Sequence, residues 1–170
     1  MFGQKPIYLT KGDILHKFNT ASVEKVKDLL KHPTEILITS HYNPDGDAIG
    51  SSLAMVAYLR MKGHTVHLIL PNDFPDFLGW MPGIEETVIY FHHSKLADRL
   101  LASAELIFCL DYNAIPRVNL FADKLFNAKG YKILIDHHLQ PEDHFDLLFS
   151  VIDTSSTSEL VYDFIDAIGD

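Results

Sequence analysis

Short apolar runs alternate along the chain with longer segments in which apolar residues recur every three or four positions. The short runs predict strands over residues 36–38, 65–70, 87–90, 105–110, 131–135 and 147–152. The longer segments predict helices over residues 10–32, 48–62, 94–103, 119–128 and 156–165. Strands that alternate with helices indicate an α/β fold, with three α/β/α layers and a mainly parallel sheet.

The stretch from Ile36 to Ser52 combines a buried strand, a polar turn and the start of a helix. His41, Asp45 and Asp47 therefore lie on a loop at a helix N-terminus, where open α/β sheets bind ligands. Two interpretations of the acidic pair are open. One is an Asp-Gly turn with Asp47 as the helix N-cap, and the other is a cation site that relieves the repulsion between two close carboxylates.

Length and composition favour a single globular domain spanning residues 1–170. Hydrophobic residues make up 47% of the chain and charged residues 22%, and no apolar run approaches the roughly 20 residues of a membrane helix. The first residues do not read as a secretory signal, so we expect a cytoplasmic protein without membrane association. The single cysteine, Cys109, lies in an apolar run and is interpreted as a buried, inert thiol.

The formal net charge of −9 limits the partners that the chain can bind. A long nucleic-acid duplex is tracked by clustered Lys and Arg, which this sequence lacks. Small anionic substrates remain possible if part of the acidic surplus holds cations.

Several predicted strands end in side chains that bind metals. These residues are His41 with Asp45 and Asp47, then Asp111, then Asp136, His137 and His138, and finally Asp153. Because the carboxyl ends of parallel strands meet at one edge of the sheet, we expect these side chains to converge. So many carboxylates do not stay ionised together without cations, and mixed imidazole and carboxylate ligands suit Mn²⁺ better than Ca²⁺.

Other features favour structural interpretations. The histidines at positions 64, 67, 92 and 93 read as strand or junction residues, and the aromatic-rich stretch 74–82 reads as a packed connecting loop rather than the wall of a binding cleft. No dinucleotide-binding glycine fingerprint, P-loop or Gly-x-Ser-x-Gly motif is present. A metal-activated water is therefore favoured over a serine nucleophile.

The order of these motifs resembles the DHH phosphoesterase family over roughly residues 35 to 165. The resemblance rests on His-x-x-x-Asp-x-Asp at residues 41–47, Asp111, the tripeptide at residues 136–138, and Asp153 with the polar residues 155–159. The amino-acid sequence of the first motif is most similar to that of the branch of nanoRNases and 3′-phosphoadenosine-5′-phosphate phosphatases. The type II inorganic pyrophosphatases of the family are more distant.

The resemblance implies two bound divalent metal ions, for which Mn²⁺ is the favoured identity and Mg²⁺ is the alternative. His41 and Asp45 would bind one ion. Asp47, His137 and Asp153 would bind the other, and Asp111 would bridge. His138 would contact the phosphate, and Asp136 would orient a histidine. The implied reaction is hydrolysis of a short oligonucleotide or of adenosine 3′,5′-bisphosphate by metal-activated water, and a homodimer is possible.

Family members continue into a smaller substrate-binding domain, whereas this sequence stops at Asp170. We therefore expect an incomplete substrate-binding cleft that offers few hydrogen-bond donors to a phosphate group. Arg117 is the one arginine near a motif, and it is either a substrate contact or a solvated helix start. The rival interpretations are a metal-loaded nucleotide-binding or regulatory module without turnover, and a pyrophosphatase-like hydrolase.

Overall fold

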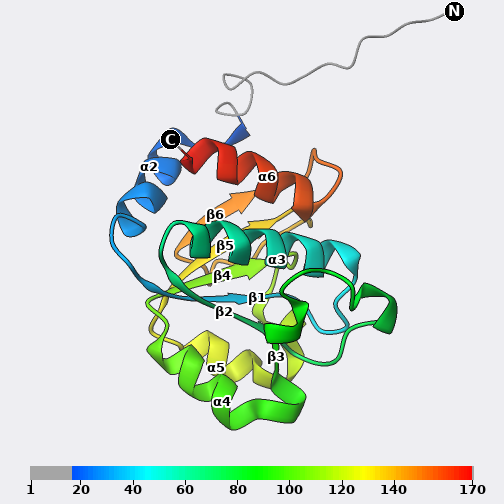
Figure 1. The fold of residues 1–170 in the computed structure, drawn as a ribbon. Helices are drawn as coiled ribbons and strands as arrows, with labels where there is room; N and C mark the ends of the chain where they lie inside the picture. Colours follow the sequence, from blue (N-terminus) through cyan, green and yellow to red (C-terminus); the bar gives the residue numbers. More distant parts are fainter. Residues whose placement is uncertain (1–16, 170) are drawn as a thin grey trace, which may run out of the picture.

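The computed structural model describes residues 17–169, which form an α/β fold around a six-stranded parallel sheet (Figure 1). The elements are α2 (Thr20–Leu29), β1 (Glu35–Thr39), α3 (Gly46–Met61), β2 (Thr65–Leu70), η1 (Asp76–Leu78), η2 (Ile84–Glu86), β3 (Val88–Ile89), α4 (Tyr90–Ser103), β4 (Leu106–Leu110), η3 (Ile115–Phe121), α5 (Ala122–Asn127), β5 (Tyr131–Asp136), β6 (Leu147–Ser150) and α6 (Thr157–Ile168). The predicted start of the first helix, at Thr10, lies outside the described residues.

The strand order is β3-β2-β1-β4-β5-β6, and every neighbouring pair is parallel. The chain winds outward from β1 in one direction and from β4 in the other, so the order reverses between these two strands. Loops at the carboxyl ends diverge there, and open sheets bind ligands at this switch point. The same strand order occurs in dinucleotide-binding folds. The absence of the glycine fingerprint therefore argues against a dinucleotide-binding loop, but not against this strand order.

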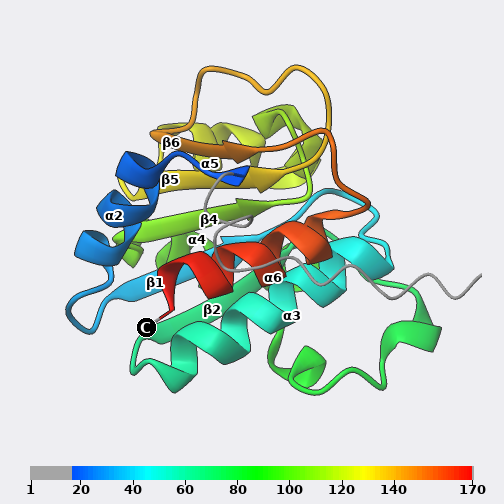
Figure 2. The same cartoon turned by 90° about the horizontal axis from the view of Figure 1, so that it is seen from above.

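Helices cover both faces of the sheet and complete three layers. Figures 1 and 2 show α2, α3 and α6 on one face and α4 with α5 on the other. Within β1, Ile36 and Ile38 join the core under α3 and α6, whereas Leu37 joins the core under α4 and α5. Both faces of each central strand are buried, which explains why the strands read as continuous apolar runs.

Three details differ from the sequence-based expectation. The helix predicted over residues 119–128 is instead the 3₁₀ segment η3 followed by the short helix α5, with a left-handed residue at Asn119 (φ 49°). β6 ends at Ser150, so Asp153 follows a turn instead of a strand end. Helix α4 begins at Tyr90 instead of Ser94, so His92 and His93 lie within its first turns and not at a strand-to-helix junction.

Gly130 is required for close packing. A Cβ atom at this position would lie 2.6 Å from the carbonyl oxygen of Ala104 and 2.9 Å from Cγ1 of Ile107. We expect Gly130→Ala to lower the free energy of unfolding by about 2 kcal/mol, as overpacking typically does, in urea titrations. Gly50→Ala is the control, because its Cβ would meet Ser158 at an ordinary 3.6 Å. Equal stability of the two variants would contradict this explanation.

Two expectations about buried and apolar residues can be compared with the structure. Cys109 is fully buried, as predicted, and burial raises the pKa of its thiol to about 12. No helix within residues 17–169 is long and apolar enough to cross a membrane.

Candidate metal centre

Two groups of potential metal ligands lie at the carboxyl edge of the sheet, and they share one residue. The ligand atoms of each group lie within 4.8 Å of one another, the first group being His41, Asp45 and Asp111 and the second Asp111, His137 and His138. Asp111 follows β4 directly, at the switch point of the sheet. The topology therefore brings together side chains that are far apart in the sequence.

His41 is buried near the start of the loop that joins β1 to α3. Its Nδ1 lies 2.9 Å from the carbonyl oxygen of Tyr42, and its Nε2 lies 3.5 Å from Oδ2 of Asp111. Because a carbonyl only accepts hydrogen bonds, Nδ1 donates and Nε2 faces Asp111. The interaction with Asp111 raises the pKa of His41 above its ordinary value despite burial. In the neutral ring, Nε2 is the nitrogen left to bind a cation.

Asp45 and Asp47 have different roles in the local structure. Asp45 is the N-cap of α3, and its Oδ1 accepts hydrogen bonds from the backbone N–H groups of Asp47 and Ala48 at 2.9 and 3.0 Å. The alternative with Asp47 as the N-cap is therefore wrong. The Asp47 carboxylate instead accepts from the N–H groups of Thr157 and Ser158, both at 2.8 Å. The N-terminus of α6 thus holds Asp47.

Asp111 is 2% exposed and adopts a left-handed backbone conformation with φ 65°. The hydroxyl of Thr157 donates to its Oδ1 at 2.8 Å, while Oδ2 faces His41. Burial acts to raise the pKa of Asp111, but hydrogen bonds from His41 and Thr157 outweigh burial and lower it. Asp111 is therefore an ionised carboxylate whose two oxygens face different neighbours.

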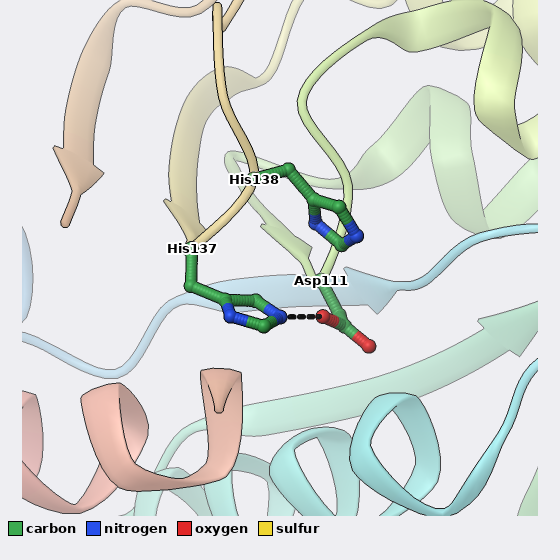
Figure 3. Close-up of side chains that lie close together, drawn as sticks. All are labelled: Asp111, His137 and His138. Atoms are coloured by element: carbon green, nitrogen blue, oxygen red, sulfur yellow. Dashed lines mark ion pairs between the residues drawn. The ribbon is translucent and has the colours of Figure 1, made fainter. Parts of the chain in front are cut away.

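The tripeptide at the end of β5 directs its two imidazoles to one place. Asp136 is fully buried and accepts from the backbone N–H of His138 at 3.1 Å, and its Oδ1 lies 2.6 Å from Nδ1 of the same residue. This contact fixes the His138 ring and leaves Nε2 for another partner. Figure 3 shows His137 turned toward Asp111, with Nε2 3.6 Å from Oδ1. The same Nε2 lies 3.9 Å from Oδ2 of Asp47.

Two other predicted site residues, Asp153 and Arg117, are exposed. Asp153 is exposed and belongs to neither ligand group. Arg117 is exposed on η3, and its carbonyl oxygen accepts a hydrogen bond from the backbone N–H of Tyr42 at 2.8 Å. The backbone of Arg117 is thus joined to the His41 loop.

His92 has a carboxylate partner that the sequence did not reveal. Its Nε2 lies 2.8 Å from Oδ1 of Asp73, and both side chains are well exposed. Neither His92 nor His93 belongs to the two ligand groups found among residues 17–169.

Sequence reasoning did not single out Thr157 or the backbone of Ser158, although both lie within the polar residues 155–159. Ser156 is the N-cap of α6, and its hydroxyl accepts from the N–H of Glu159 at 3.1 Å. The Glu159 carboxylate, however, accepts from the N–H and hydroxyl of Ser155, and these bonds lower its pKa to about 2. Nothing in the sequence around Ser156 indicated that Thr157 and Ser158 donate hydrogen bonds to Asp47 and Asp111.

The chain is similar in sequence to a known protein family and to one of its members. Residues 35–169 match the family described as "DHH family, N-terminal domain". The bifunctional oligoribonuclease and PAP phosphatase NrnA of Thermus thermophilus is 35% identical over 136 residues, which are 79% of this chain and 37% of that protein.

Solved structures show the same fold. An exopolyphosphatase-related protein from Bacteroides fragilis superposes with a TM-score of 0.87 at 42% identity, covering 89% of this chain and 44% of that one. RecJ from Thermus thermophilus, solved in complex with Mn²⁺, gives a TM-score of 0.53 at 14% identity, covering 86% of this chain and 20% of that one. The chain spans less than half the length of each of these proteins.

Proposed function

The chain belongs to the DHH family, and from this we propose that it is the catalytic domain of a manganese-dependent phosphoesterase. Its proposed substrates are short oligonucleotides or adenosine 3′,5′-bisphosphate. The observation that carries the proposal is the shared carboxylate, because two groups of imidazole and carboxylate ligands meet at Asp111. Similarity to an oligoribonuclease and PAP phosphatase supports the choice of substrates.

The residues present fit a pair of divalent cations. Asp111 is ionised, the neutral ring of His41 leaves Nε2 free for a cation, and mixed nitrogen and oxygen ligands suit Mn²⁺, with Mg²⁺ as an alternative. His41 and Asp45 would hold one ion, Asp47, His137 and Asp153 would hold the other, and Asp111 would serve both. The place of Asp153 rests on its motif alone. When bound, such ions activate water and neutralise charge on a phosphoester.

The other residues of the centre position substrate and ligands. Asp136 accepts from Nδ1 of His138 and fixes the ring, and in the doubly protonated imidazolium form Nε2 of His138 would donate to a phosphate oxygen. The N-terminus of α6 holds the Asp47 carboxylate with two backbone N–H groups and keeps it in place. In this proposal the bulk of substrate orientation comes from contacts outside residues 17–169, and we propose that a second, substrate-binding domain supplies them.

Hydrolysis by the 170-residue chain tests the proposed function. The substrates are diadenylate, adenosine 3′,5′-bisphosphate, pyrophosphate, polyphosphate and p-nitrophenyl phosphate, each with Mn²⁺ or with EDTA. We expect slow hydrolysis of the first two and of p-nitrophenyl phosphate, lost in EDTA and restored by Mn²⁺. Nucleotide binding without turnover would favour the regulatory module, and preference for pyrophosphate would favour the pyrophosphatase-like alternative.

Thr157 should affect metal binding without being a ligand. Its buried hydroxyl donates to Asp111, and Thr157→Val removes that donor while keeping the shape of the side chain. We expect Mn²⁺ affinity to fall about tenfold in calorimetric titrations, since loss of a partner that orients a ligand costs roughly 10–100-fold. Thr157→Ser keeps a hydroxyl and should bind nearly as the parent does. Equal affinities for the Val and Ser variants would show that this hydrogen bond is unimportant.

A further inference from the structure

The loop between β2 and β3, residues 71–87, carries the two most exposed aromatic side chains of residues 17–169. Phe77 is 74% exposed and Trp80 is 75% exposed. The sequence favoured a packed connecting loop, which holds for the half-buried Phe74 and the buried Leu78 but not for these two rings. Large apolar side chains left in water often mark a binding surface.

The backbone that carries these rings is well held. Leu78, between them, is buried in the core, and it anchors η1. The N–H of Leu78 donates to the carbonyl of Pro75 at 2.9 Å, and the N–H of Met81 donates to the carbonyl of Leu78 at 3.1 Å. Phe77 and Trp80 therefore project from a fixed turn, which is suited to binding a rigid planar group.

The loop contacts the turn that carries Asp45 and Asp47. Cδ2 of Leu78 lies 3.9 Å from the position of a Cβ built on Gly46, the residue between Asp45 and Asp47. Asn72 joins the loop to the turn before Asp45, accepting from the backbone N–H of Asn43 at 2.7 Å and donating to its side chain at 3.0 Å. Figures 1 and 2 both show the loop between β2 and β3 beside the start of α3.

The charges of the loop select the kind of group that it can bind. Its ionisable side chains are all acidic, namely Asp73, Asp76, Glu85 and Glu86. Asp73 is paired with His92, and Glu86 with Arg60. These acidic side chains disfavour phosphate, whereas the two exposed aromatic rings favour a flat, uncharged group. A nucleotide contains both kinds of group. Its phosphate would bind at the candidate metal centre, and its base would stack on the exposed aromatic rings.

We propose that Phe77 and Trp80 form a stacking subsite for a nucleobase of the substrate whose phosphate is bound at the candidate metal centre. The subsite rests on the proposed function for its choice of substrate. Stacking on aromatic side chains tolerates any base, so the subsite selects nucleotides over base-free phosphate esters without reading sequence.

The fluorescence of Trp80 tests the subsite, because it is the only tryptophan in the chain. The full chain is titrated in Mg²⁺ buffer with diadenylate or with ribose 5-phosphate, with excitation at long wavelength and correction against free tryptophan. We expect saturable quenching by diadenylate and none by ribose 5-phosphate. Phe77→Ala should weaken diadenylate binding at least about fivefold, the lower limit for losing one base-stacking partner.

Phe126→Ala is the matched control, since Phe126 is 50% exposed in the last turn of α5, a helix on the other face of the sheet from α3. It should bind diadenylate as the parent does. Equal quenching by both ligands, no quenching by either, or unchanged affinity in Phe77→Ala would overturn the subsite. Base-dependent quenching without hydrolysis would keep the subsite and reject the proposed function. Hydrolysis of diadenylate without base-dependent quenching would do the reverse.

Discussion

Asp111→Asn should lose both divalent ions and, with them, phosphoester hydrolysis. Asp111 is the one residue common to the two ligand groups, so its neutralisation removes a charged ligand from each. The loss of Mn²⁺ affinity should exceed the roughly 100-fold upper range for changes in residues that only orient ligands. Calorimetric titration of Mn²⁺ and metal content after gel filtration measure it directly.

The choice of asparagine separates the carboxylate from the fold. Asp111 has a left-handed backbone conformation, which asparagine adopts more readily than most residues, and the amide keeps nearly the same shape. We expect the metal-free variant to fold, which circular dichroism and thermal unfolding in EDTA can check. Asp123→Asn, an exposed carboxylate in α5, is the control and should bind Mn²⁺ normally. If Asp111→Asn binds two ions like the parent, Asp111 does not bridge.

Much of the fold could be predicted because the strands are buried on both faces. Residues 65–70 form a strand as predicted, since a short apolar run bounded by turn residues has few other solutions in a compact domain. The segment after β4 was harder. The helix predicted from residue 119 begins only at Ala122, after a 3₁₀ segment with a positive φ at Asn119, and the spacing of apolar residues indicates neither feature.

The candidate site was predictable to the level of the strand ends but not to the level of contacts. Parallel strands bring Asp111 and His137 to one edge, which the alternation of elements implies. The contacts from Thr157 to Asp111 and from the α6 backbone to Asp47 join residues 46 and 110 or 111 positions apart, and no local pattern reports them. Asp45 caps α3, whereas the Asp47 carboxylate accepts from the N–H groups of Thr157 and Ser158, and the local sequence does not distinguish these two roles.

His137→Ala and His138→Ala should separate metal binding from phosphate binding. Nε2 of His137 faces the carboxylates of Asp111 and Asp47 at 3.6 and 3.9 Å, as a metal ligand would. We therefore expect His137→Ala to lose one ion and to lower thermal stability in Mn²⁺ toward that of the metal-free chain, because ligands that bind the folded state stabilise it.

His138 is held differently, through Nδ1 by the buried carboxylate of Asp136, and its Nε2 is assigned to the phosphate. His138→Ala should keep two ions and the thermal shift that Mn²⁺ produces, while the turnover of p-nitrophenyl phosphate falls. His138 also lies close to Asp111 and His137, so the alternative is that His138 is itself a metal ligand. The two variants test this alternative directly. Loss of an ion in both variants, in equal measure, would assign His138 to the metal and leave phosphate binding to other residues.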